Sequence, residues 1–349
     1  MKLPSTLLGA LYALHATAQN MSFNANNFYK SPFVTIHPVS FPSQNNLSIA
    51  GNLFVANNLS SFSTSTPETS HPGIVVGHPM GAVKEQSANL YATKLAEHGF
   101  VTLSLDLTFW GGSEGIPRNG VSPDLYTEAF SAAVDYLGTQ EIVRVDRERI
   151  GGMGICGSGG FMLGAAKVDS RIRAVATASM YDMGAASRDG LRNSQSLSQR
   201  KDIIEQASQQ RWVEADGGPI EYTGGTPNRL TPNTSAVGAE FFDFYRTRRG
   251  EFTPPNTTPN LTTHPTLSSN VKFMNFYPFQ DLDSISPRPL LFVSGDRAHS
   301  REFSEDAYSS AAQPKDLIWI PGAGHVDLYD RVALIPWERL VGFFGEGLA

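Results

Sequence analysis

Short apolar runs alternate with amphipathic stretches through most of this chain. Two early segments, residues 33–36 and 47–55, have the composition of two strands in an antiparallel hairpin. From residue 73 onward, apolar runs predict buried strands, and apolar residues at helical spacing predict helices. The predicted strands are 73–77, 100–105, 149–154, 174–178, 289–295 and 317–320, and the predicted helices are 85–98, 123–137 and 332–344. This alternation predicts an α/β fold with a mostly parallel, doubly wound sheet covered on both faces.

The alternation breaks between residues 181 and 283. This stretch holds a polar helix candidate, 199–211, an aromatic one, 237–245, and loops rich in Gly, Pro and Thr. We interpret it as a cap inserted into the α/β core, whose two parts are then residues 19–180 and 284–349. Its aromatic side chains are candidates for an apolar substrate pocket, although about half of them are expected to be ordinary core residues.

The N-terminal residues 1–18 resemble a secretory signal peptide. Lys2 precedes an apolar core, and Ala16-Thr17-Ala18 offers a cleavage site. The chain is therefore expected to be secreted and glycosylated; the alternative is an intracellular protein with a mildly apolar N-terminus. Asn-x-Ser/Thr sequons support secretion, and they start at Asn20, Asn46, Asn58, Asn233, Asn256 and Asn260. No segment is long and apolar enough for a transmembrane helix.

Composition and charge limit the classes of binding partner that this chain is expected to have. The 349 residues are 40% hydrophobic and 17% charged, with a net charge of −6, which describes a globular protein. The absence of a long basic run argues against a nucleic-acid partner. No HExxH, clustered Cys/His or Walker-type loop is found, so no metal or organic cofactor is expected. The expected partner is a small molecule, and the oligomeric state stays open.

The single cysteine, Cys156, occupies the most informative position. It follows a predicted strand and precedes a helix start in the sequence Gly-Ile-Cys-Gly-Ser-Gly-Gly, residues 154–160. A strand, a tight turn and a helix with a nucleophile at the turn form a nucleophile elbow, whose neighbours must be small. Ser158 is the alternative nucleophile, in a register two residues further into the helix. The remaining alternative is an inert, buried cysteine.

A cysteine nucleophile needs a base, and His325 is the best candidate. It lies in a glycine-rich loop directly after the last predicted strand, with His299 as a weaker rival. Asp296 directly follows the predicted strand at residues 289–295 and is the expected acid that orients the histidine. The order nucleophile, acid, histidine is that of the α/β-hydrolases. The expected donors for an oxyanion are the backbone amides of Met80 and Gly157.

Several motifs together resemble the α/β-hydrolase superfamily, and more narrowly its dienelactone-hydrolase-like branch. The most similar family is that of fungal polyketide transferases and uncharacterised bacterial hydrolases. Its pattern appears at His78-Pro79, Asp106, residues 112–118, 154–160, 248–250, 288–291, 299–304 and 322–330. The resemblance covers roughly residues 35–345 and implies an α/β-hydrolase fold with a cap.

The resemblance and the residues together predict a hydrolase or acyltransferase. The expected substrate is an ester or thioester, and polyketide-derived esters and thioesters are among the candidates. The expected intermediate is an acyl-cysteine at Cys156. The alternatives are a secreted carboxylesterase or dienelactone-type hydrolase, and a non-catalytic binding protein on the same fold. The dienelactone branch has a glycine where this chain has Ser158, and this departure argues against a dienelactone substrate.

Overall fold

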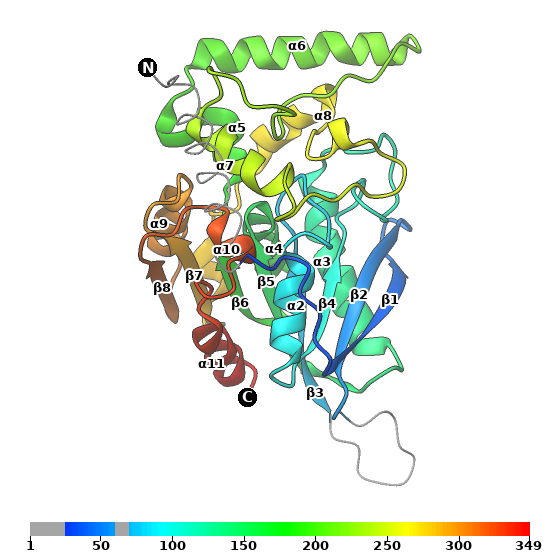
Figure 1. Cartoon of the computed structure of the whole chain (residues 1–349), viewed down its shortest axis with the longest axis vertical. Helices are drawn as coiled ribbons and strands as arrows, with labels where there is room; N and C mark the ends of the chain where they lie inside the picture. The colour runs from blue at the N-terminus through cyan, green and yellow to red at the C-terminus, as the bar shows by residue number, and fades with distance from the viewer. Residues whose placement is uncertain (1–24, 60–69) are drawn as a thin grey trace, which may run out of the picture.

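The computed structural model describes residues 25–59 and 70–349, and the predicted signal peptide lies outside these ranges. The described chain forms an eight-stranded sheet in the order β1-β2-β4-β3-β5-β6-β7-β8 (Figure 1). The strands are β1 (Val34–Pro42), β2 (Ser48–Ala56), β3 (His71–Gly77), β4 (Val101–Leu105), β5 (Val145–Ile155), β6 (Ile172–Ala178), β7 (Leu290–Gly295) and β8 (Lys315–Ile320). Every strand predicted from the sequence is present.

The pairing of the strands explains where a site can form. β1 pairs antiparallel with β2, and β2 pairs antiparallel with β4, as the predicted hairpin requires. The remaining neighbours, from β4 through β3, β5, β6 and β7 to β8, all run parallel. The carboxyl ends of these parallel strands therefore lie along one edge of the sheet, where open α/β sheets bind their ligands.

Helices cover both faces of the sheet, and each face has its own hydrophobic core. One core packs α3 (Pro123–Thr139), α4 (Gly157–Val168) and α9 (Arg301–Ser310) against the strands. The other core packs α2 (Ala88–Ala96) and α11 (Trp337–Gly347) against the strands. The predicted doubly wound α/β architecture is thus confirmed.

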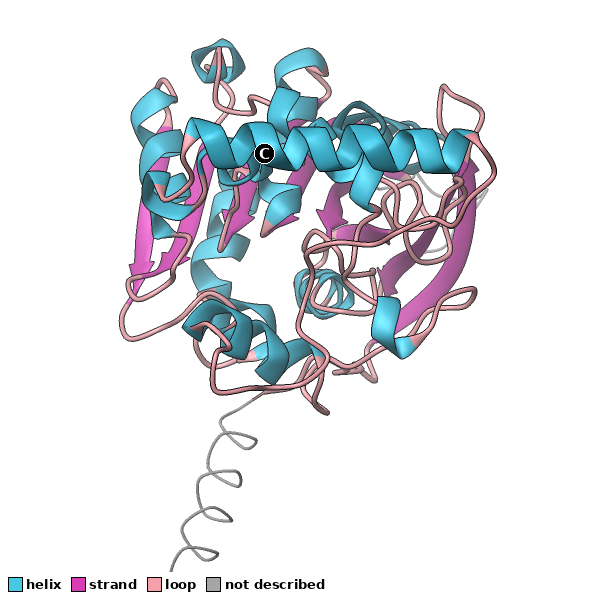
Figure 2. Cartoon of the chain, turned by 90° about the horizontal axis from the view of Figure 1, so that it is seen from above, coloured by secondary structure: helices cyan, strands magenta, loops and turns pink. Residues whose placement is uncertain are grey.

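The segment between β6 and β7 lies beyond the carboxyl edge of the sheet (Figure 1). Its elements are α5 (Met183–Asp189), η1 (Leu191–Asn193), α6 (Leu197–Ala215), α7 (Ala236–Tyr245), η2 (Pro259–Leu261), α8 (Leu267–Asn270), η3 (Val271–Asn275) and η4 (Leu282–Ile285). The long helix α6 runs across the top of the molecule (Figure 2). In the described residues, no helix is both long and apolar enough to cross a bilayer.

Two predicted helices begin later than the sequence indicated, and α9 is one of the helices that were not predicted. α2 begins at Ala88 rather than at residue 85, because Ser87 has a positive φ of 70° and interrupts the helical backbone. α11 begins at Trp337 rather than at residue 332, because Pro336 occupies the position before the helix. α9 was not predicted, although Phe303 and Ala307 give it a buried face.

Candidate active site

Cys156 occupies the turn between β5 and α4, as expected for a nucleophile elbow. Its backbone has φ 54° and ψ −123°, a conformation that residues with a side chain rarely adopt. A Cβ added to Gly154 would lie 2.4 Å from the carbonyl oxygen of Ser158, so only glycine fits there. The close approach of strand and helix therefore explains the small residues of this motif.

The thiol of Cys156 has three hydrogen-bonding neighbours. The backbone amides of Met80 and Gly157, the two donors expected for an oxyanion, both hydrogen-bond to its sulfur, and so does the hydroxyl of Tyr329. Burial nevertheless raises the pKa of the Cys156 thiol to about 11, because desolvation outweighs the effect of these three hydrogen bonds. The resting residue is thus a thiol rather than the thiolate that an exposed helix N-terminus would favour.

A cavity of about 260 Å³ opens beside Cys156. The core contributes Met80 and Tyr329 to its wall, and the inserted segment contributes aromatic and small side chains. The lining from the insertion includes Met183, Phe241, Tyr245, Thr263 and Phe273. None of the described residues that line the cavity carries a charge. Part of the predicted aromatic set therefore faces the cavity, whereas Trp212, for example, is exposed on α6.

His325 lies in the loop after β8 and is completely buried. Its Nδ1 atom is 2.5 Å from Oγ of Ser300, and its Nε2 atom is 2.8 Å from the hydroxyl of Tyr329. Burial, and secondly the neighbouring His299, lower the pKa of His325 well below its usual value. The imidazole is therefore neutral at neutral pH, which is the form that a base requires.

The expected hydrogen bond between Asp296 and His325 is not formed in the described chain. Oδ1 of Asp296 instead accepts from the backbone amide of Gly322 at 2.8 Å. Both ring nitrogens of His325 have other partners, Ser300 and Tyr329. The carboxylate lies on the expected edge of the sheet and binds the start of the histidine loop, and Asp296 as the orienting acid stays a prediction.

The rival residues also have defined places. Ser158 is buried in α4 and donates to the carbonyl oxygen of His78 at 2.5 Å, so its hydroxyl points into the protein. His78 contacts the carbonyl of Pro79 and accepts from the amide of Leu107, and it shapes the loop that carries Met80. The ring of His299 lies beside that of His325, with centroids 4.6 Å apart and the ring planes tilted by 36°.

Glu240, on α7, was missed by sequence reasoning. Its Oε2 is 2.9 Å from Nδ1 of His299, and its Oε1 accepts from the amide of Val326. No sequence motif marked this glutamate, because it reaches the site from the inserted segment. It lies 85 positions before His325 in the chain. Its contacts are visible only once α7 is folded over the core.

Tyr329 was also missed as a site residue, although a signal was present. It lies four positions after His325 on the short helix α10 (Asp327–Asp330), inside the motif at residues 322–330 that resembles a family pattern. Its hydroxyl contacts His325, Cys156 and Tyr245. A buried tyrosine one helical turn from a candidate base was the available clue.

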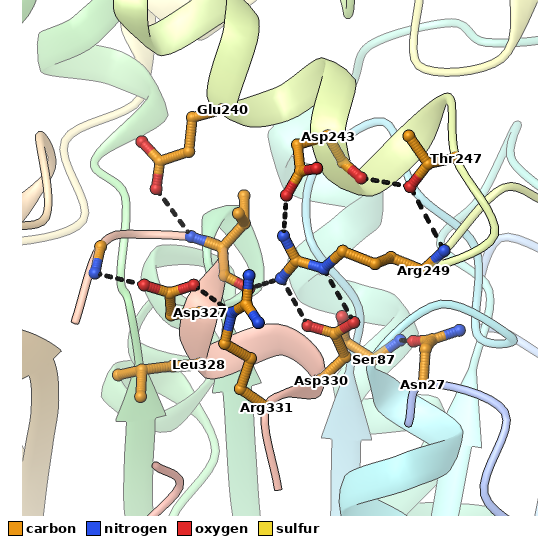
Figure 3. A network of polar contacts seen from close by, with 12 residues as sticks. Asn27, Ser87, Glu240, Asp243, Thr247, Arg249, Asp327, Leu328, Asp330 and Arg331 are labelled. Carbon is orange, nitrogen blue, oxygen red and sulfur yellow. Dashed lines mark hydrogen bonds and ion pairs between the residues drawn. The ribbon is translucent and has the colours of Figure 1, made fainter. Parts of the chain in front are cut away.

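A polar network fastens the inserted segment to the histidine loop (Figure 3). The guanidinium of Arg249 is buried, and its Nη2 lies 2.6 Å from Oδ1 of Asp330 and 3.1 Å from the carbonyl of Val326. The same guanidinium also bonds to Asp243 of α7. Because α10 carries both Tyr329 and Asp330, this network fixes the position of the tyrosine relative to the cap.

Comparison with known proteins adds a family to this geometry. The model of the alpha/beta hydrolase family matches residues 74–335. The chain belongs to the alpha/beta hydrolase family. Uncharacterized protein PA2218 of Pseudomonas aeruginosa is 47% identical to this hydrolase over 277 residues, which cover 79% of this chain and 73% of the relative. The crystal structure of PA2218 matches with a TM-score of 0.84 at 42% identity, covering 93% of this chain and 97% of that one.

Two fungal relatives have names that describe an activity. Thiohydrolase aneE of Aspergillus aculeatus is 24% identical over 298 residues, 83% of this chain and 86% of the relative. Polyketide transferase claH of Penicillium crustosum is 23% identical over 265 residues, 74% of this chain and 79% of the relative. The resemblance inferred from the motifs is thus confirmed, and the chain is an alpha/beta hydrolase with thiohydrolase-type relatives. In the described residues, no group of three His, Cys, Asp or Glu side chains could hold a metal ion.

Proposed function

We propose that this alpha/beta hydrolase cleaves or transfers the acyl group of an ester or thioester through an acyl-cysteine at Cys156. The observation that carries this proposal is the position of the Cys156 sulfur, which contacts the amides of Met80 and Gly157 at the wall of a cavity. A carbonyl carbon that reaches this sulfur brings its oxygen near both donors. The relative named thiohydrolase favours a thioester as substrate.

The chemistry follows from the resting protonation states. Formation of the bond between Sγ and the carbonyl carbon releases the thiol proton toward the neutral imidazole of His325. The negative charge that develops on the carbonyl oxygen is stabilised by the Met80 and Gly157 amides. Collapse of the adduct expels a thiol or alcohol, which takes the proton back. Water, or an alcohol in the case of transfer, then attacks the acyl-cysteine.

The lining of the cavity supports a neutral, largely apolar acyl group. Methionine and aromatic side chains such as Met183, Phe241 and Phe273 surround the space beside Cys156, and no described lining residue is charged. A substrate carboxylate in this space would lose its hydration without gaining a cationic partner, which is costly. Short fatty or aromatic acyl thioesters are therefore expected to be better substrates than dicarboxylic ones.

Intact-protein mass spectrometry after brief exposure to a panel of acyl thioesters and aryl esters tests the proposal. The wild type should gain one acyl group, and Cys156→Ala should gain none. Cys156→Ser is the matched variant, because it keeps an oxygen nucleophile at the same turn. Acyl transfer to Cys156→Ala contradicts the proposal. A wild type that shows neither adduct nor turnover with the whole panel favours a binding protein.

Added alcohol separates hydrolysis from transfer. If deacylation uses water alone, alcohols of increasing concentration leave the turnover of a thioester unchanged. If an alcohol is the natural acceptor, turnover rises and an ester product accumulates. The relative named polyketide transferase is the reason to include this arm.

Secretion remains a separate proposal. The sequon asparagines Asn46, Asn58, Asn233, Asn256 and Asn260 are all exposed in the described chain, as glycosylation requires. Expression with the native N-terminus in a eukaryotic host should yield protein in the medium whose mass falls on enzymatic deglycosylation. Unmodified protein retained in the cells contradicts secretion.

A further inference from the structure

The hydroxyl of Tyr329 occupies the position between the candidate nucleophile and the candidate base. It is 2.8 Å from Nε2 of His325, and it also hydrogen-bonds to Sγ of Cys156. A third hydrogen bond joins it to the hydroxyl of Tyr245. The side chain is completely buried, and its ring packs edge-on against Phe244 at 5.1 Å between centroids.

The hydrogen-bond directions follow from the number of protons available. A neutral imidazole carries one N–H, and with this proton on Nδ1 it donates to Oγ of Ser300, 2.5 Å away. Nε2 is then an acceptor, and the Tyr329 hydroxyl donates to it. The oxygen of Tyr329 in turn accepts from the thiol of Cys156. A continuous chain of donors thus runs from Cys156 through Tyr329 and His325 to Ser300.

We propose that Tyr329 is a catalytic residue that relays the proton between Cys156 and His325. As Sγ bonds to the carbonyl carbon, its proton passes to the oxygen of Tyr329 while the hydroxyl proton of Tyr329 passes to Nε2 of His325. Tyr329 ends the step neutral, His325 becomes an imidazolium, and the negative charge resides on the carbonyl oxygen. The reverse transfer delivers a proton to the leaving group. This inference rests on the proposed acyl-cysteine chemistry.

Neighbouring side chains hold the hydroxyl in this role. Tyr245 lines the cavity and hydrogen-bonds to the Tyr329 oxygen from the side of the inserted segment. Asp330, the next residue, is held by Arg249. A phenylalanine at position 329 would keep the ring contacts and lose only the hydroxyl, so the relay can be removed without a cavity in the core.

The test compares Tyr329→Phe with Tyr91→Phe. Tyr91 is also buried and donates to the carbonyl of Leu328 at 2.7 Å, so its variant loses a hydroxyl that braces the same helix without touching Cys156 or His325. Single-turnover acylation by an acyl thioester, followed by mass spectrometry, should slow by about 100-fold or more in Tyr329→Phe, the usual contribution of positioned proton transfer. Tyr91→Phe should acylate within about 3-fold of the wild type, with a lower melting temperature from the lost hydrogen bond.

A proton inventory separates a relay from a structural role. In mixtures of light and heavy water, the wild-type acylation rate should depend on deuterium fraction along a curve, because two protons move together. In Tyr329→Phe the residual rate should depend on it linearly. A linear dependence in the wild type, or acylation of Tyr329→Phe at the wild-type rate, overturns the relay while leaving the acyl-cysteine proposal intact. If the wild type forms no adduct at Cys156, the proposed function itself fails.

Discussion

The elbow loop, residues 154–160, and the histidine loop, residues 321–331, follow strands of the same sheet but are held in different ways. The elbow is shaped mainly by its own backbone: Gly154 admits the close approach of α4, and the amide of Gly157 reaches the thiol. The histidine loop is held by residues from elsewhere in the chain, such as Ser300 and Arg249. Geometry of the nucleophile is therefore a local property, whereas geometry of the base depends on tertiary contacts.

Activity measurements on the base and the predicted acid should break this comparison most clearly. His325→Asn should lower kcat/KM for an ester or thioester by about 100- to 10,000-fold, because the proton acceptor is lost. Asp296→Asn keeps an oxygen that can accept from Gly322 and should change kcat/KM by less than about 3-fold. A loss in Asp296→Asn as large as in His325→Asn would instead support Asp296 as the orienting acid.

Removal of the buried cation tests how far the histidine loop depends on the inserted segment. Arg249→Met leaves Asp330 buried without its partner and should lower the free energy of unfolding by about 3–5 kcal/mol. Arg339→Met breaks an exposed pair with Asp316 and should cost about 1 kcal/mol or less. Chemical denaturation of both variants provides the measurement. Equal costs would mean that the Arg249 network adds little to the loop.

The reactivity of the free thiol sharpens the electrostatic side of the comparison. Because the pKa of Cys156 is raised to about 11, only thiol is present at neutral pH, and the thiolate fraction grows as pH rises toward that value. Alkylation by iodoacetamide at pH 8 should therefore be roughly 100-fold slower than that of a free cysteine, and it should climb until about pH 11. Rapid alkylation near neutral pH would instead indicate a thiolate paired with an imidazolium.

Alanine substitutions at one glycine in each loop give the smallest expected effects. In Gly154→Ala the new methyl group meets backbone atoms of α4 and should cost about 1–3 kcal/mol through overpacking, with a loss of acylation as the turn shifts. Gly322 has a φ of 75° and open space around it, so Gly322→Ala should cost only about 1 kcal/mol. Thermal denaturation and single-turnover acylation measure both. A larger effect at Gly322 would reverse the proposed contrast.

The strands and the elbow could be predicted because their signals are local. Apolar runs of strand length appear wherever both faces of a parallel sheet are buried, and the glycines around Cys156 reflect contacts within one strand–turn–helix unit. Helix ends were less predictable. α2 begins later than predicted because Ser87 has a positive φ, and the presence of a serine does not predict that backbone conformation.

The acid illustrates a different limit. Asp296 was chosen because a carboxylate at the end of a strand lies on the catalytic edge of the sheet, and it does lie there. The sequence positions of Asp296 and His325 could not show that the Asp296 carboxylate accepts a hydrogen bond from the Gly322 amide. A backbone amide in a tight loop needs a hydrogen-bond acceptor, and which acceptor it binds is determined only by the folded loop.

The sequence by itself determined the order of the strands along the chain, the parallel sheet, the turn that presents Cys156 and the family to which the chain belongs. Only the tertiary structure decided the partners of His325, the position of Tyr329 between base and thiol, and the burial that raises the pKa of Cys156. The physical reason is the distance along the chain over which each property is determined. Backbone conformation and hydrophobic periodicity depend on neighbouring residues, whereas hydrogen-bond partners and desolvation depend on side chains brought together from distant segments.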